Sequence, residues 1–230
     1  MPAVPFMIKR FPSPLQMPVA LPVAVAPALQ IADAYSTDDD HLAWVRWLFQ
    51  SARLRGGSLT FASAETHRSA LLKDWEHYTH QLWLPGMAPV ILTAWQAAME
   101  GQDEKLWHSG DHLPERLDAA HLERSVEAGR WLLESTRGAK YQGALGRLRQ
   151  KIESTGKEPH LPVIWGAVAA LFQMPALDML MAVLAEEWRA GNSACLQHAD
   201  PQGPLSFSAL AAVAMRQASL APPRLHGQPQ

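Results

Sequence analysis

The sequence predicts an all-α protein, and three observations support this fold class. Apolar residues recur at the three- and four-residue spacing of a helix face along most of the chain. No stretch alternates apolar and polar residues over the length of a β-strand. Glycine and proline residues separate the periodic segments, as they do between helices. Since 48% of the 230 residues are hydrophobic, we expect one helical bundle of roughly seven to nine helices around a sizeable core.

The helices follow from this spacing and from local start and stop signals. Acidic residues after Ser36 can cap a first helix over 38–54, which ends at Gly56-Gly57. A second helix is expected over 65–83, and Pro85-Gly86 is expected to break the chain. A helix over 87–100 comes next, and residues 102–116 are expected to form a loop with a short turn. The remaining helices are expected at 117–136, 139–154, 163–173, 176–190 and 206–219.

Composition divides the chain into three parts. Residues 1–34 are expected to form a proline-rich arm without fixed structure, since seven prolines lie within residues 1–30. The helical domain is expected over 35–220, and residues 221–230 are expected to be a flexible tail. The apolar stretch 17–29 resembles a signal peptide, but its three prolines would interrupt the helix that such a peptide needs.

The net charge, the hydropathy and the cysteine content limit the partners and the cellular location that we expect. The net charge of −2 predicts no nucleic-acid partner, because no basic excess exists to neutralise phosphates. No apolar run is long enough to span a bilayer, so no membrane segment is expected. A single cysteine, Cys195, excludes an internal disulfide and favours a reducing, cytoplasmic location.

Candidate chemistry is sparse. His77 and His80 are spaced so that both rings could face one ion on a helix, yet the further ligands of a tight zinc site are missing. His108 and His112 are four apart, but Gly110 and Pro114 argue against a rigid helix there. Nucleophile and phosphate-loop motifs are absent from the sequence. The pair Glu186-Glu187 is expected to lie on a solvated helix face. We therefore predict no catalytic, cofactor or metal-binding residue, and no enzyme.

A patch of small residues, Gly191–Cys195, follows the amphipathic segment 176–190. Small side chains allow two backbones to approach closely. The patch therefore suits tight packing, either inside the core or across a symmetric dimer, and the sequence does not decide between these two.

Four motifs between residues 87 and 196 resemble those of one family. The first is an apolar helix with a tryptophan, Met87–Ala98, followed by Gly101-Gln102-Asp103. The second contains Ser125, Gly129, Arg130, Leu132 and Leu133. The third contains Pro162, Val163, Gly166, Ala169, Ala170, Leu171 and the joint Met174-Pro175. The fourth contains Leu180, Leu184, Asn192, Ser193, Ala194 and Leu196. In this order and separation, residues 88–210 resemble the urease accessory protein UreF.

The resemblance implies a function without catalysis. It implies a helical scaffold or chaperone subunit that dimerises, binds the accessory protein UreD (also called UreH) and recruits the GTPase UreG. That assembly delivers nickel to apo-urease. For partner or dimer contacts we expect these residues: Tyr35, Gly129, Arg130, Ser193, Ala194 and Gln202. Gly129 and the Ser193-Ala194 pair are expected to permit close helix contact.

The chain also departs from the family pattern. The glycine- and serine-containing N-terminal motif is reduced to Ala20-Leu21-Pro22-Val23, followed by Ala24-Val25-Ala26-Pro27, and the late glutamine-rich motif to Gln202-Gly203. These departures leave open a UreF-like assembly factor for another metalloenzyme. The histidines leave open a protein of another class, a small metal-dependent helical hydrolase that uses His77, His80 and others.

Overall fold

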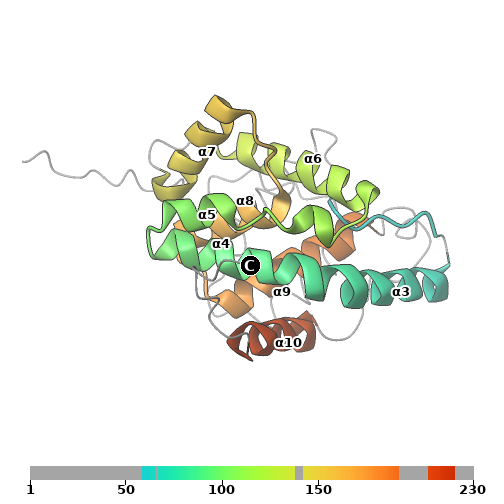
Figure 1. Ribbon diagram of the computed structural model, residues 1–230. Coiled ribbons are helices and arrows are strands. Elements are labelled where there is room, and N and C mark those ends of the chain that lie inside the picture. Colours follow the sequence, from blue (N-terminus) through green and yellow to red (C-terminus); the bar gives the residue numbers. More distant parts are fainter. Residues whose placement is uncertain (1–58, 66, 138–141, 192–206, 221–230) are drawn as a thin grey trace, which may run out of the picture.

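The structure is a computed structural model that describes residues 59–65, 67–137, 142–191 and 207–220 (Figure 1). These residues form helices joined by short connections, and no strand occurs among them. The predicted all-α fold is therefore confirmed. The helix predicted over 38–54, the arm and the tail lie outside the described residues.

The first described helices run end to end as one rod. α3 (Arg68–His77) passes into the π-helix η3 (Tyr78–Met87), which passes into α4 (Ala88–Met99) (Figure 1). The backbone stays helical at both joints, since Tyr78 and Ala88 have right-handed φ and ψ angles. Residues 68–99 thus form a continuous helix that changes its hydrogen-bond pattern in the middle.

The expected break at Pro85-Gly86 is therefore wrong. Proline interrupts an α-helix because it lacks an N–H and clashes with the preceding turn. The π pattern bonds residues five apart, and this wider turn is the usual form of a local irregularity inside a helix. The Thr79 hydroxyl donates to the carbonyls of Trp75 and Glu76 at 2.9 and 3.1 Å, where the two patterns meet. Arg116 Nη1 donates to the Pro85 carbonyl at 3.0 Å.

Residues 102–116 also differ from the prediction. The structure has a helix that was not expected, α5 (Asp103–His108), whereas the 3-10 turn η4 (Leu113–Glu115) agrees with the expected short turn. The expectation failed because α5 is short and largely polar, with only Leu106 buried. Asp103 and Glu104 in its first turn favour this helix through the peptide dipoles.

Two further helices cover one side of the molecule. α6 (Ala119–Ser135) begins at Asp118, whose side chain accepts the His121 N–H at 2.9 Å. α7 (Gly143–Thr155) ends at Gly156, which has the left-handed φ of +72° that favours glycine. Arg147 and Lys151 of α7 pair with Asp103 and Glu104 of α5 at 2.6 and 2.7 Å.

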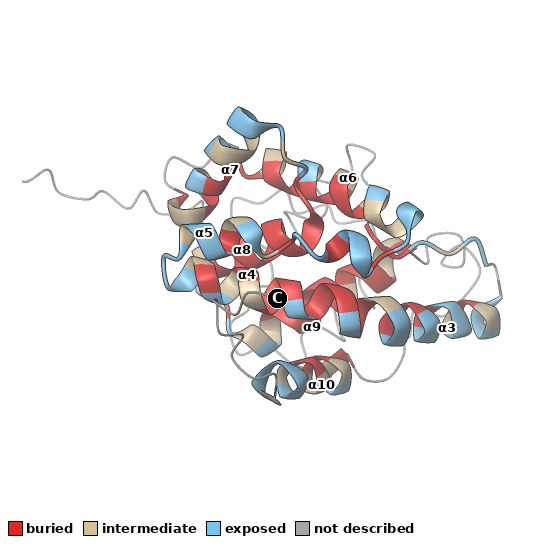
Figure 2. Ribbon diagram, viewed as in Figure 1, coloured by how far each residue is buried: buried red, intermediate tan, exposed pale blue. Residues whose placement is uncertain are grey.

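α8 (Leu161–Leu171) lies at the centre of the fold. All ten residues 161–170 are buried (Figure 2). Its Gly166 lies against α4, where an added Cβ would be 2.7 Å from the Ile91 carbonyl oxygen and 2.8 Å from the Trp95 nitrogen. The glycine therefore sets the close approach of α4 and α8. An all-apolar helix of this kind is a core helix, and it offers no free face to a partner.

The last two helices close the core. α9 (Ala176–Gly191) and α10 (Phe207–Leu220) pack against each other and have the bounds that the sequence predicts, to within one residue. Trp188 of α9 stands edge-on to Trp75 of α3, with 5.3 Å between ring centroids, and Phe207 of α10 meets the same Trp75 ring at 6.1 Å. Aromatic contacts thus join the beginning of the described rod to α9 and to the start of α10.

Candidate interaction surface

α6 separates buried from exposed positions, and two predicted site residues fall on its opposite sides. Gly129 is buried, whereas its neighbour Arg130 is exposed. Adjacent residues of a helix point about 100° apart, so one can face the core while the next faces solvent. Gly129 therefore packs inside the fold, whereas Arg130 faces solvent.

Gly129 makes a close contact inside the chain. A Cβ at this position would overlap the carbonyl oxygen of Pro159 and would be 2.7 Å from the nitrogen of Leu161. Because backbone atoms cannot move aside as a flexible side chain can, the contact admits only a hydrogen atom. The close approach predicted for Gly129 is thus one between α6 and the start of α8. A contact of Gly129 with a partner stays a prediction.

Arg130 lines a groove along the exposed side of α6. Apolar side chains of α6 and three carboxylates surround it, with Glu158 contributed by the segment before α8. The lining residues are Ala119, Leu122, Glu123, Val126, Glu127, Arg130, Trp131 and Glu158. Among the described residues no hydrogen bond or ion pair engages the Arg130 side chain. The groove therefore combines an apolar floor, a negative rim and one available guanidinium.

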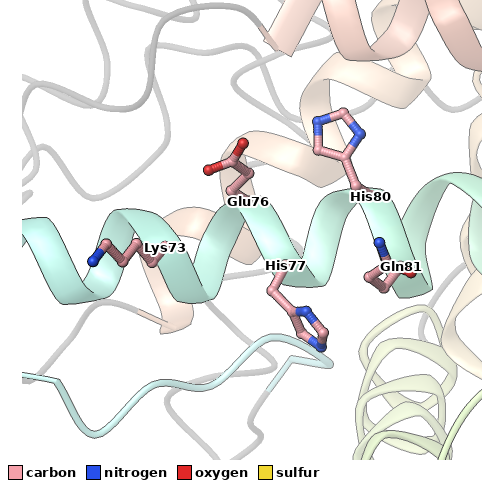
Figure 3. A pocket seen from close by; sticks show the side chains of 5 residues that line it. All are labelled: Lys73, Glu76, His77, His80 and Gln81. Atoms are coloured by element: carbon pink, nitrogen blue, oxygen red, sulfur yellow. The ribbon is translucent and has the colours of Figure 1, made fainter.

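The histidine pair does not form a metal site. Figure 3 shows the rings of His77 and His80 pointing to different sides of the rod, with Glu76 directly before His77 in sequence. Both side chains are exposed, and they line a shallow hollow with Lys73 and Gln81. The pair spans the joint of α3 and η3, where the change of helical pitch alters the i, i+3 alignment.

Two other described histidines, His108 and His112, have acidic partners nearby. His108 Nδ1 lies 2.7 Å from the Asp111 carboxylate, and His112 Nδ1 lies 3.6 Å from that of Glu115. His160 is buried before α8, and burial lowers its pKa. Among the described residues no group of three or more histidine, cysteine, aspartate or glutamate side chains is placed to hold a metal ion.

The expected solvated face at Glu186-Glu187 is wrong. Both residues are buried, and Glu187 is 0% exposed. Glu186 pairs with Arg189, and Glu187 Oε2 accepts the Phe61 N–H at 2.7 Å. Burial is the main cause that raises the pKa of Glu187 to about 7. A signal for this was present, since Leu180, Leu184, Glu187 and Gly191 share one helical face.

Four other predicted contact residues cannot be placed. Tyr35, Ser193, Ala194 and Gln202 lie outside the described residues. Of the small-residue patch only Gly191 is described. An added Cβ there would overlap the Phe61 ring, so Gly191 packs closely within the chain. The contacts predicted for the rest of the patch stay predictions.

Fold and surface together define a helical protein that carries a mixed apolar and acidic groove along α6. In the described part of the chain, no helix combines the length and hydropathy that a bilayer crossing requires. The model of the UreF family matches residues 66–219, which is about two thirds of the chain. The chain therefore belongs to the urease accessory protein UreF family. No curated protein and no solved structure matches it.

Family membership confirms the resemblance seen in residues 88–210 and extends it at both ends. It gives the chain an accessory role in urease maturation. Members of the family are generally non-catalytic.

Proposed function

We propose that this chain is a non-catalytic scaffold and chaperone subunit of a urease maturation complex. In that complex it binds a UreD/UreH-like accessory protein, recruits a UreG-like GTPase and supports nickel insertion into apo-urease. It acts as a homodimer in the cytoplasm. The observation that carries the proposal is the UreF family match over residues 66–219.

The α6 groove supports a role in partner contact. Its apolar floor of Leu122, Val126 and Trp131 provides area that a partner can bury, and its rim offers charges of both signs. Arginine is enriched at the energetically important positions of interfaces, because its planar group makes several directed hydrogen bonds. Arg130 is therefore the described residue that we assign first to partner binding.

Charge reversal at Arg130 tests this assignment. Arg130→Glu is expected to weaken co-purification with the UreD/UreH-like and UreG-like proteins by tenfold or more, since a fourth carboxylate would replace the one cation of the groove. Lys105→Glu is the matched control, because Lys105 is an exposed cation on α5 outside the groove. Equal binding by both variants would remove Arg130 from the interface.

A second function is supported by the N-terminal sequence. The family motif around residues 20–27 lacks its glycines and serines here, and this part lies outside the described residues. A UreF-like factor that serves another metalloenzyme would account for that loss. Normal holo-urease in a strain without this chain would favour this second function.

A further inference from the structure

Residues 59–63 precede α3 and run across the helical body as an extended strap. Leu59, Thr60 and Phe61 are buried, although no helix or sheet contains them. The strap is the point at which the first 58 residues join the described fold. The contacts that hold the strap therefore fix the position of residue 59, to which those 58 residues are joined.

Three backbone hydrogen bonds hold the strap, each to a different group. Phe61 N–H donates to Glu187 Oε2 at 2.7 Å, and Ser63 N–H donates to the Gly191 carbonyl at 3.2 Å. Arg124 Nε of α6 donates to the Thr60 carbonyl at 2.8 Å. The strap is thus bound by α6 on one side and by the last turn of α9 on the other.

The Phe61 ring anchors the strap in an aromatic cluster. Its centroid lies 4.9 Å from that of Trp75, 5.1 Å from Tyr78 and 6.4 Å from Trp188. The ring also fills the space beside Gly191 that a Cβ would need. The same contact therefore fixes the end of α9, from which residues 192–206 continue.

Three groups bind the backbone of the strap: Glu187, the Gly191 carbonyl and Arg124. Glu187 differs from the other two because its charge can change. Its side chain is fully buried, and its Oε1 has no hydrogen-bond partner within the described residues. Hydrogen bonding by Phe61, Thr60 and Tyr78 favours the ionised carboxylate, but burial disfavours it more strongly, so the pKa is raised. A protonated carboxyl in this place leaves no net charge in the core, and its carbonyl oxygen can still accept the Phe61 N–H. An ionised carboxylate would be a desolvated charge, which is strongly unfavourable without a full set of partners.

We propose that the strap is a proton-controlled latch: residues 59–63 stay bound while Glu187 is neutral and detach when Glu187 ionises. Detachment exposes the apolar surface that Phe61 covers and removes the strap's contacts with the last turn of α9. The closed form is favoured below neutral pH, because burial raises the pKa of Glu187 to about 7.

The charged and titratable neighbours do not cancel this effect. Tyr78 of η3 is neutral in this range, since burial and the nearby Glu187 raise its pKa. On α6, Arg124 bonds the strap, and His121 stacks on Tyr78 with Asp118 at 2.8 Å from its Nδ1. On α9, Glu186 is paired with Arg189. Asp74 of α3 accepts from Ser63 Oγ at the exposed end of the strap, and Arg216 of α10 is exposed.

Amide hydrogen exchange of the full chain between pH 5 and 9 tests the latch. The readout is the protection factor of a peptide covering 59–65, corrected for the pH dependence of intrinsic exchange. We expect protection to fall about tenfold from pH 6 to pH 8 and to level off above pH 8, where Glu187 is ionised in both forms. The protection factor of a peptide covering 161–171, in the core helix α8, should not show this pH dependence.

Glu187→Gln supplies the matched variant, because glutamine keeps the shape and the acceptor but cannot ionise. Its 59–65 protection should be independent of pH between 6 and 8. Glu100→Gln, at the exposed end of α4 and away from the strap, should behave as the parent chain. A flat profile in the parent chain overturns the latch, and this holds even if Glu187→Gln does not fold. The latch is also overturned if the peptide 161–171 loses protection in parallel with 59–65. It is overturned as well if the protection of 59–65 in Glu187→Gln depends on pH.

Discussion

At the scale of residues, neighbouring positions in one motif divide structural and surface roles. Gly129 and Arg130 are adjacent in α6, yet one lies against the backbone of Pro159 and Leu161 and the other lines the groove. A sequence motif does not reveal this division, because both residues contribute equally to the pattern. A substitution at Gly129 is therefore tested by fold stability, and one at Arg130 by partner binding.

Gly129→Ala is expected to destabilise the fold, whereas Arg130→Ala is not. The new methyl group would overlap backbone atoms, and overpacking of this kind costs about 1–3 kcal/mol or more. The exposed Arg130→Ala change should stay within about 0.5 kcal/mol of the parent chain. Chemical denaturation followed by circular dichroism measures both. An unchanged midpoint for Gly129→Ala would show that α6 and the start of α8 are not in this contact.

Glu187 gives stability a pH dependence of defined sign. Its pKa is about 7 in the folded chain and about 4.5 when exposed, so the folded state binds more protons between these values. The free energy of unfolding therefore decreases as pH rises through this window and levels off above it. The free energy of unfolding of Glu187→Gln, taken relative to that of the parent chain, should therefore be about 2–3 kcal/mol larger at pH 8 than at pH 5.

Denaturant titrations at pH 5 and pH 8 measure this difference. His160 acts in the opposite direction, because burial lowers its pKa, but its contribution is common to both chains and cancels. A stability difference that does not change with pH would show that Glu187 is not a buried ionisable group.

At the scale of elements, the sequence predicts helices well where apolar spacing is strong and fails where hydrogen bonding changes. The helices over 176–190 and 206–219 appear within one residue of their predicted ends. The break at Pro85 does not occur, since a π-helical segment accommodates the proline. Periodicity reports which face is buried, but it does not report which carbonyl each N–H will bond. The same limit explains why the short polar α5 was missed.

The joint of α8 and α9 carries a residue in an unfavourable backbone conformation. Gln173 has a φ of +53°, and the Met174 N–H bonds the Ala169 carbonyl across the helix end at 3.0 Å. Glycine adopts this left-handed conformation without the Cβ clash. Gln173→Gly is therefore expected to raise the free energy of unfolding by about 0.5–1 kcal/mol.

Gln173→Ala is the control for this joint, because alanine keeps the Cβ. It should remain close to the parent chain in thermal unfolding, while Gln173→Gly should melt a few degrees higher. Equal melting temperatures for the two variants would mean that the left-handed conformation costs the fold nothing.

At the scale of the whole molecule, the all-α fold and the family follow from the sequence, while the arrangement of the surface does not. The four helical motifs sufficed to indicate UreF, and the family match is broader than they are. Two features needed the folded chain. The groove joins α6 to Glu158, and the strap joins residues 59–63 to α9. Both depend on contacts between distant parts of the sequence, which local patterns do not encode.

The proposed role requires this helical body to act through its surface on a urease apoenzyme. The most direct measurement is the nickel content and activity of urease purified from cells that lack this chain, with and without a plasmid that supplies it. We predict nickel-poor, inactive urease in the first case and restored nickel and activity in the second. Fully loaded, active urease from cells without the chain would contradict the proposed role.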